Sequence, residues 1–417
     1  MNNFDSAINS PKKNTTTELS GNWDAFNKQQ LEKLISDYGK GGKFYNQEKP
    51  PYAIFDWDNT SIFLDIQEAT LIYQLENLLL GYTPEILKKA LQTEVEISAE
   101  LADTNTEKQK ITTAQVAEDI VKSYTWIYNN YSPLSGNGSL TKDEIKAHPH
   151  YLNFRSKVRF LYDAIYNTFG AGVAYPWVTY LFAGLDLPKI AAMTVETVKW
   201  QLAQKIETVI WESPSESELD RQLSGQVSVS WKNGLRLIPE LQQLYKEMEK
   251  AGFDIWICSA SFIDVIKGIS TNPDFGYGIT PSKIIAMELE RDEYGKLLPE
   301  FKKGYFQTQG EGKTEVIKKL LSGPTGKYGY DPVFIAGDSE GDQNMLADFN
   351  GLKAGLIFNR LNFKGKPLEK LVKNAIVDYG KNGVKYLLQG RDENSGTLIP
   401  EQGTIRFGEK SAQKIPK

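Results

Sequence analysis

Three short apolar runs, at residues 52–55, 254–258 and 332–336, each end in a cluster of polar residues. A fourth polar cluster, at 310–314, opens a helical run at 315–321. Apolar runs of this length are typical of strands that are covered on both faces, as in a parallel sheet. Residues 239–252 carry apolar side chains at helical spacing and end on glycine, which predicts a helix. The alternation predicts a Rossmann-like, doubly wound α/β fold with ligands at the carboxyl ends of its strands.

Nearly 200 residues separate the first polar cluster from the second. A crossover between parallel strands needs only about a dozen residues, so this interval predicts an inserted domain. Its patterns are mostly helical, and we expect a large helical cap inserted after the first strand. The predicted division is a polar disordered tail over 1–20, a core over 21–71 and 233–393, the cap over 72–232, and a C-terminal arm over 394–417.

Composition and charge narrow the function only slightly. The 417 residues are 40% hydrophobic and 24% charged, as in ordinary globular proteins. A net charge of −5 argues against a nucleic-acid partner. The single cysteine, Cys258, excludes an internal disulfide, and residues 1–20 contain no apolar signal-peptide core. The most apolar stretch, 170–185, is too short for a transmembrane segment and contains Pro176, so we expect a buried cap helix.

The first polar cluster carries two carboxylates, Asp56 and Asp58, directly after a predicted strand. At a strand's carboxyl edge, both side chains can serve one site. One carboxylate can attack phosphorus while the other protonates the leaving oxygen and later deprotonates water. A turn rich in Asp and Asn is the alternative explanation.

The later clusters supply a cation and further oxygen ligands. Lys313 lies in a Gly-Lys-Thr sequence, but Gln307 stands where a P-loop requires glycine, so the nucleotide interpretation fails. Asp338 and Asp342 follow the last predicted strand, and carboxylates are ligands that Mg²⁺ prefers. A surface lysine and a polar turn are the alternatives. The order of the four clusters is more specific than any one of them.

In this order and strand context, the clusters resemble the haloacid dehalogenase superfamily of phosphatases. The resemblance covers residues 50–70 and 235–360, and the motif residues are Asp56-Trp-Asp-Asn-Thr60, Ser259, Lys313 and Gly337-Asp-Ser-Glu-Gly-Asp342. It implies that Asp56 is the nucleophile, that Asp58 is the general acid and base, and that Lys313 neutralises charge shared by the phosphate and Asp56.

The resemblance also implies the remaining roles and the cofactor, Mg²⁺. Ser259, the amide of Ala260, Thr60 and Lys313 would bind phosphate oxygens. Asp56, the carbonyl of Asp58 and Asp338 would ligate the metal, with Asp342 as a ligand or directly behind it. The acid at Asp58 is absent from dehalogenases, so the pair implies hydrolysis of a phosphate monoester.

The position of the insertion is similar to the phosphoserine phosphatase branch of the superfamily. The segment from Asp58 to Glu68 and the sequence at 257–261 are similar to bacterial phosphorylcholine phosphatases. The implied substrate is a small phosphoester such as phosphorylcholine or phosphoethanolamine. Phosphoserine or another small phosphometabolite is one alternative, and a non-catalytic surface binding protein is another. Because similar phosphatases are exported, an extracytoplasmic location is implied, with the cytoplasm as the alternative.

The predicted cap is rich in aromatic residues: 14 of the 59 residues from 124 to 182 are aromatic, against 12% in the chain. Aromatic faces bind quaternary ammonium groups by cation–π attraction. The candidates for a choline pocket are Trp126, Tyr128, Tyr175, Trp177 and Tyr180. Asp65 and Glu68 are candidates for holding a cationic head group. The alternatives are that the rings form the core of the cap and that the two acids lie on an exposed helix face.

Overall fold

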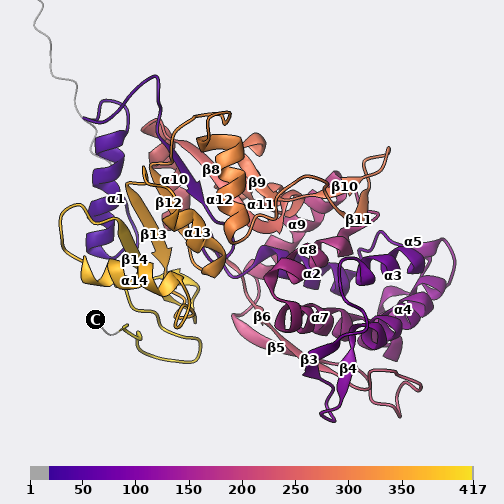
Figure 1. Ribbon diagram of the computed structural model, residues 1–417. Coiled ribbons are helices and arrows are strands. Elements are labelled where there is room, and N and C mark those ends of the chain that lie inside the picture. Colours follow the sequence, from indigo (N-terminus) through magenta and orange to yellow (C-terminus); the bar gives the residue numbers. More distant parts are fainter. Residues whose placement is uncertain (1–17, 416–417) are drawn as a thin grey trace, which may run out of the picture.

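A six-stranded parallel sheet forms the centre of one lobe, and a largely helical lobe lies beside it in the computed structural model, which describes residues 18–415 (Figure 1). The strands of the sheet are β1 (Tyr52–Phe55), β8 (Asp254–Phe262), β9 (Ile284–Met287), β12 (Phe334–Gly337), β13 (Ala354–Phe358) and β14 (Tyr386–Gln389). Their spatial order is β14-β13-β12-β1-β8-β9, and every neighbouring pair is parallel. Counted along the chain this is the order 3-2-1-4-5-6, so the predicted fold class is confirmed.

Both faces of the sheet are buried, which explains why its strands are continuous apolar runs. In β1, Ala53 and Phe55 belong to one buried cluster, whereas Tyr52 and Ile54 belong to another. Helices α1 (Ala25–Tyr38), α10 (Pro239–Lys250) and α11 (Ile263–Ser270) contribute to the first cluster. Helices α12 (Glu311–Ile317), α13 (Gln343–Ala347) and α14 (Leu368–Val377) contribute to the second. The helix predicted over 239–252 is confirmed as α10.

The chain leaves the core through β2 (Ile62–Phe63) and returns through β7 (Arg236–Leu237), which pair antiparallel. We call residues 64–235 the cap. Its helices are α2 (Ile66–Asn77), α3 (Pro84–Gln92), α4 (Thr113–Asn130), α5 (Ser132–Ser135), α6 (Lys142–Ala147), α7 (Pro149–Phe169), α8 (Ala171–Thr179) and α9 (Leu187–Leu202). Its two hairpins are β3–β4 (Glu100–Thr104, Lys110–Thr112) and β5–β6 (Glu207–Glu212, Ser228–Asn233).

A second connection between the lobes comes from the hairpin β10–β11 (Leu289–Arg291, Leu297–Phe301), which the sequence patterns do not indicate. It extends from the core toward the cap (Figure 1). The carbonyl of Leu297 accepts a hydrogen bond from Gly184 N at 2.8 Å, and its amide donates to Leu185 O at 2.9 Å. Lys89 and Glu300 form an ion pair at 2.6 Å. The cap is therefore held by this hairpin as well as by β2 and β7.

The apolar stretch 170–185 forms α8 and a following 3₁₀ turn, with Pro176 inside α8 and Trp177 and Val178 buried. Among the described residues, no single helix is both long and apolar enough to cross a membrane. The pair Ala171–Phe182 and Leu187–Leu202 passes the same test together, but it bends by 106° at the break.

The two ends of the described chain lie on the core. Most of the predicted tail, residues 1–17, lies outside the described residues, whereas Leu19 is fully buried beside α1. The C-terminal arm follows β14 and contains the short pair β15 (Arg391–Asp392) and β16 (Thr397–Leu398). This arm lies against loops at the carboxyl edge of the sheet, through contacts described below.

Candidate active site

Asp56 lies at the carboxyl end of β1, beside the point where the strand order reverses between β1 and β12. Its backbone amide donates to Ala336 O of β12 at 3.0 Å, so the neighbouring strand fixes its position. Its carboxylate is buried, with Oδ1 2.6 Å from Lys313 Nζ. The hydroxyl of Thr60 lies 3.1 Å from Asp56 Oδ2 and 3.1 Å from Asp338 Oδ1. Thr60 therefore links the loop after β1 to the loop after β12.

Lys313 projects from α12 and is only 2% exposed. Its ammonium group lies 2.6 Å from Asp56 Oδ1 and 2.6 Å from Asp342 Oδ1. Burial opposes the charged form of this side chain, but the two carboxylates outweigh burial and raise its pKa. Lys313 therefore stays protonated, which is the state needed to neutralise a developing negative charge.

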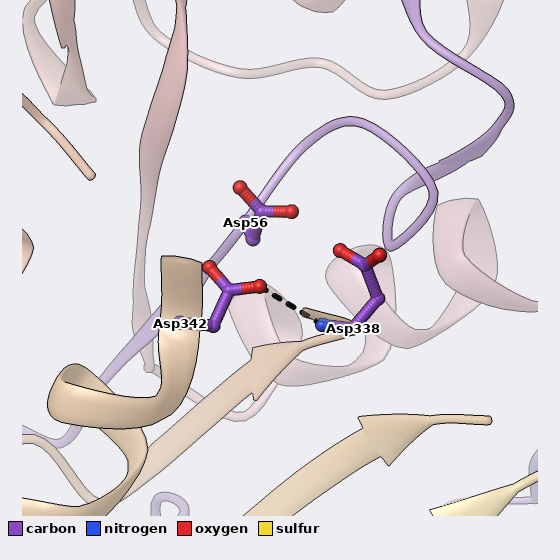
Figure 2. Close-up of side chains that lie close together, drawn as sticks. All are labelled: Asp56, Asp338 and Asp342. Atoms are coloured by element: carbon purple, nitrogen blue, oxygen red, sulfur yellow. Dashed lines mark hydrogen bonds between the residues drawn. The ribbon is translucent and has the colours of Figure 1, made fainter. Parts of the chain in front are cut away.

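Three carboxylates, from Asp56, Asp338 and Asp342, lie close together (Figure 2), and two of them contact Lys313. Each offers an oxygen atom, and these atoms lie within 4.8 Å of one another. Asp342 Oδ2 accepts hydrogen bonds from Asp338 N at 3.0 Å, drawn in Figure 2, and from Ser339 N at 3.1 Å. Because Lys313 engages its other oxygen, Asp342 already has partners on both sides. Asp56 and Asp338 also have partners on both oxygens, but unlike Asp342 they line the cavity between the core and the cap, so they are better placed to hold a metal ion.

Asp58 faces the same cavity from the loop after β1. Its Oδ1 accepts from Ile66 N at 2.7 Å, and its Oδ2 accepts from the hydroxyl of Ser261 at 2.5 Å. Burial raises the pKa of Asp58 well above its usual range, and the nearby carboxylate of Asp65 adds to this effect. A raised pKa favours the protonated form of the carboxyl group, which is the form that a general acid needs.

These groups border a cavity of about 90 Å³ between the core and the cap. The core contributes Asp56, Asp58, Asn59, Ala260, Ser261, Gln309, Lys313, Asp338, Ser339, Gly341 and Arg360. The cap contributes Asp65, Gln67, Tyr162, Tyr175 and Val178. One end of the cavity therefore holds the charged groups of the strand edge, and the other end holds phenol rings and one carboxylate.

Several predicted residues lie directly behind the cavity wall instead of in it. Thr60 and Asp342 are buried and act through the contacts given above. Ser259 is fully buried, and its hydroxyl accepts from Ser261 N at 3.1 Å. The cavity wall is formed there by Ala260 and Ser261. The predicted turn at residues 259–261 is wrong, because these residues still belong to β8, which runs to Phe262; the hydroxyl that borders the cavity is that of Ser261.

Of the predicted head-group residues, Asp65 and Tyr175 line the cavity and the other five do not. Trp177 is buried and donates from its indole to Leu91 O at 3.0 Å. Tyr180 donates to Glu94 at 2.5 Å.

The other candidates also have partners away from the cavity. Trp126 stacks on His148, and Tyr128 packs against Tyr124. Glu68 pairs with Arg159. These rings lie in the core of the cap, as Trp177 and Tyr180 do, or pack against it, as Trp126 and Tyr128 do, which agrees with the alternative explanation.

The sequence motifs missed three cavity residues in particular, Ser261, Tyr162 and Arg360. Arg360 follows β13, and its Nη1 lies 2.6 Å from Asp338 Oδ2. The sequence did point to Ser261, because this residue stands in the same polar cluster as Ser259. No sequence motif marks Tyr162 or Arg360, because each reaches the cavity only through the packing of α7 and β13.

Comparisons with known proteins agree with this arrangement. No family model matches the chain. The chain is 21% identical over 418 residues to phosphorylcholine phosphatase of Pseudomonas aeruginosa, an alignment that covers 93% of this chain and 94% of that protein. A crystal structure of a conserved protein of unknown function from Anaerococcus prevotii is 27% identical, with a TM-score of 0.83, covering 95% of this chain and 100% of that one. The resemblance to the haloacid dehalogenase phosphatases is confirmed.

Proposed function

We propose that this chain, a phosphoric monoester hydrolase of the haloacid dehalogenase type, releases phosphate through a covalent intermediate on Asp56 with Mg²⁺ as its cofactor. One observation carries the proposal. A buried carboxylate held by Lys313 and a second carboxyl group, Asp58, with a raised pKa border the same small cavity. A nucleophile and a general acid that face one ligand are the two groups that ester hydrolysis requires.

In the first half of the reaction, an oxygen of Asp56 attacks phosphorus. The bond between phosphorus and the ester oxygen breaks, and its electron pair passes to that oxygen, which takes the proton of Asp58. In the second half, water attacks the aspartyl phosphate, and Asp58 accepts the proton of the water. The phosphorus–Asp56 bond then breaks and restores the carboxylate. Lys313 lies where it stabilises negative charge in both halves.

The donor set fits a magnesium ion. Mg²⁺ prefers oxygen ligands and takes only one or two carboxylates beside waters and phosphate oxygens. Asp56 and Asp338 would hold it, because both line the cavity in which the phosphate would lie, whereas Asp342 is buried behind its wall. The three carboxylates of the cluster outnumber the cations Lys313 and Arg360, which favours binding of a cation. When bound, Mg²⁺ would neutralise charge on the phosphate and orient it toward Asp56.

The cap end of the cavity supports a substrate with a small cationic head group. Asp65 is the carboxylate that the phosphate chemistry does not use, and Tyr162 and Tyr175 lie beside it in the cavity wall. A carboxylate with aromatic rings attracts an ammonium or trimethylammonium group. Phosphorylcholine and phosphoethanolamine fit this chemistry.

Phosphoserine is the second candidate, because Arg360 also lines the cavity. An amino-acid head group offers an ammonium for Asp65 and a carboxylate for an arginine. Arg360 is paired with Asp338, however, and phosphorylcholine needs no such partner. We therefore favour the choline or ethanolamine ester. An extracytoplasmic location stays a prediction.

Phosphate release from a panel of monoesters tests the function. The panel contains phosphorylcholine, phosphoethanolamine, phosphoserine, glucose 6-phosphate and p-nitrophenyl phosphate, each with Mg²⁺ and with EDTA. We expect release that requires the metal and the highest kcat/KM on phosphorylcholine. A preference for phosphoserine would transfer the proposal to the amino-acid ester. Release from none of these esters would contradict the enzymatic function and favour a binding protein.

Replacing Asp65 by asparagine tests the head-group site. Asparagine keeps the N-cap of α2, where Asp65 Oδ1 accepts from Glu68 N at 2.8 Å, but it removes the charge. We expect KM for phosphorylcholine to rise about tenfold, equivalent to about 1.4 kcal/mol. KM for p-nitrophenyl phosphate, which lacks a cation, should change little.

Glu68→Gln is the matched control, because Glu68 lies three residues away and pairs with Arg159 instead of lining the cavity. It should leave the preference for phosphorylcholine unchanged. Equal effects of Asp65→Asn on both esters would contradict a cationic head-group site.

A further inference from the structure

Arg391 of the C-terminal arm contacts the loop that carries Asp56 and Asp58. Its side chain is only 6% exposed. Its Nη1 lies 3.1 Å from Asn59 Oδ1 and 3.5 Å from Asn59 O, and its guanidinium lies 5.0 Å from the ring centroid of Phe63. Arg391 therefore touches the loop at its turn and again in β2, where the chain departs for the cap.

This loop has a backbone that needs support. Asn59 has a φ of 59° and Leu64 a φ of 69°, both in the left-handed region, and Asn59 N donates to Leu64 O at 3.0 Å. Residues other than glycine are uncommon in this region, and they persist there where the surrounding structure holds them. The main chain and the side chain of Asn59 both lie within reach of Arg391 Nη1. Arg391 is therefore a fixed support for the turn directly after Asp58.

The burial of Arg391 is difficult to explain by folding stability alone. Its carboxylate partner is Glu393, at 3.0 Å, while its Nε has no hydrogen-bonding partner among the described residues. Burial, together with the charge of Arg360, lowers its pKa to about 10. A buried and incompletely paired cation is unfavourable, and an apolar residue of similar size would avoid that cost. An arginine at this position is better explained by what it contacts.

The same arm also supports the neighbouring loop after β13. Thr404, which is fully buried, donates from its hydroxyl to Asn359 O at 2.6 Å and accepts from Arg391 N at 3.3 Å. The side-chain amide of Asn359 donates to Gln402 O at 2.7 Å. The next residue, Arg360, lines the cavity. The arm thus holds the loops that present Asp58 and Arg360 to the cavity.

We propose that Arg391 is a positioning residue for proton transfer by Asp58. By fixing the turn at Asn59 and the strand at Phe63, it holds the carboxyl group of Asp58 where the leaving oxygen departs. The proposal rests on the proposed function. In the affected step, the phosphorus–oxygen ester bond breaks as the bond to Asp56 forms, and the proton of Asp58 passes to the departing oxygen. The requirement for that proton depends on the leaving group.

Arg391→Met tests this dependence, because methionine fills similar space without charge or donors. The probes are phosphorylcholine, whose alkoxide must be protonated, and p-nitrophenyl phosphate, whose nitrophenolate leaves as an anion. Release of the leaving group is measured in the first turnover, since hydrolysis of the aspartyl phosphate is common to both esters. We expect the rate for phosphorylcholine to fall about 100-fold, with KM changing less than about twofold. The rate for p-nitrophenyl phosphate should fall less than about threefold.

Two further variants control the result. Arg221→Met removes an arginine whose side chain is 87% exposed in the cap, and it should leave both rates unchanged. Arg391→Lys keeps the buried positive charge but loses the planar guanidinium group. We expect it to slow phosphorylcholine more than p-nitrophenyl phosphate, as Arg391→Met does. Its thermal unfolding should stay close to that of the wild type.

If the first-turnover rate fell equally for both esters in the folded variants, the positioning role would be overturned, and Arg391 would be a stabilising residue only. A wild-type protein that cleaves neither ester would instead contradict the proposed function itself. Asp58→Asn should reproduce the selectivity of Arg391→Met with a larger effect. If Asp58→Asn slowed both esters equally, the assignment of the proton to Asp58 would be wrong, and the inference about Arg391 with it.

Discussion

Asp56→Asn is expected to reduce phosphate release by at least about 10⁴-fold, because an amide oxygen does not replace a carboxylate as the nucleophile. The change is nearly isosteric, and the amide oxygen can still accept from Lys313, which is 2.6 Å from Asp56 Oδ1 in the structure. We therefore expect the variant to fold and to bind substrate. Steady-state phosphate release and thermal unfolding measure the two properties separately.

A chemical trap sharpens this prediction. Acid quenching of wild-type protein during turnover of substrate labelled with ³²P should leave label on the chain, and Asp56→Asn should carry none. Asp378→Asn is the matched control, since this exposed carboxylate on the core pairs only with Lys381 among the described residues. It should behave as the wild type in both assays. Phosphate release that survives in Asp56→Asn would place the nucleophile elsewhere.

Lys313→Met is expected to impair stability and activity together. Lys313 lies between two buried carboxylates, and its removal leaves Asp56 and Asp342 close together with no shared cation. Removing one partner of a buried ion pair costs roughly 3–5 kcal/mol. Turnover should fall by about 10³-fold, because the phosphate loses a fixed positive charge. Chemical denaturation measures the first effect, and phosphate release from the fraction that remains folded measures the second.

A second buried lysine offers a matched control. Lys157 in the cap pairs with Asp119 at 2.7 Å, and both side chains are nearly inaccessible. Lys157→Met should reduce stability but leave turnover of the folded protein unchanged. The double variant Lys313→Met/Asp342→Asn should recover part of the stability and none of the turnover. Wild-type turnover in folded Lys313→Met would contradict a role for this cation in catalysis.

The predictable parts of the fold share one physical cause. Strands β1, β8 and β12 are buried on both faces, so their sequences are short apolar runs that stand out in the chain. Their polar clusters meet because parallel strands end at the same edge. For this reason Asp56, Lys313 and Asp338 were all predictable from the sequence, and the structure brings them together.

The cap was less predictable, because an aromatic residue serves a core and a ligand pocket equally well. Tyr175 lines the cavity, whereas Trp177, two residues later in α8, is fully buried. Sequence spacing did not separate these two outcomes, which depend on how α8 packs against its neighbours. Arg360 and Arg391 were missed for a related reason. Both lie outside the four polar clusters, and only the positions of β13 and the C-terminal arm bring them to the loops of the site.

The hairpin β10–β11 has a consequence for the exchange of substrate and product. If only β2 and β7 joined the lobes, the cap would swing as a lid about one hinge. The two backbone hydrogen bonds between Leu297 and residues 184 and 185 attach the cap to the core at a second point. Opening must break these bonds, or it must be confined to the side chains around the cavity. If release of the product requires this opening, the hairpin slows a step that is independent of the chemistry.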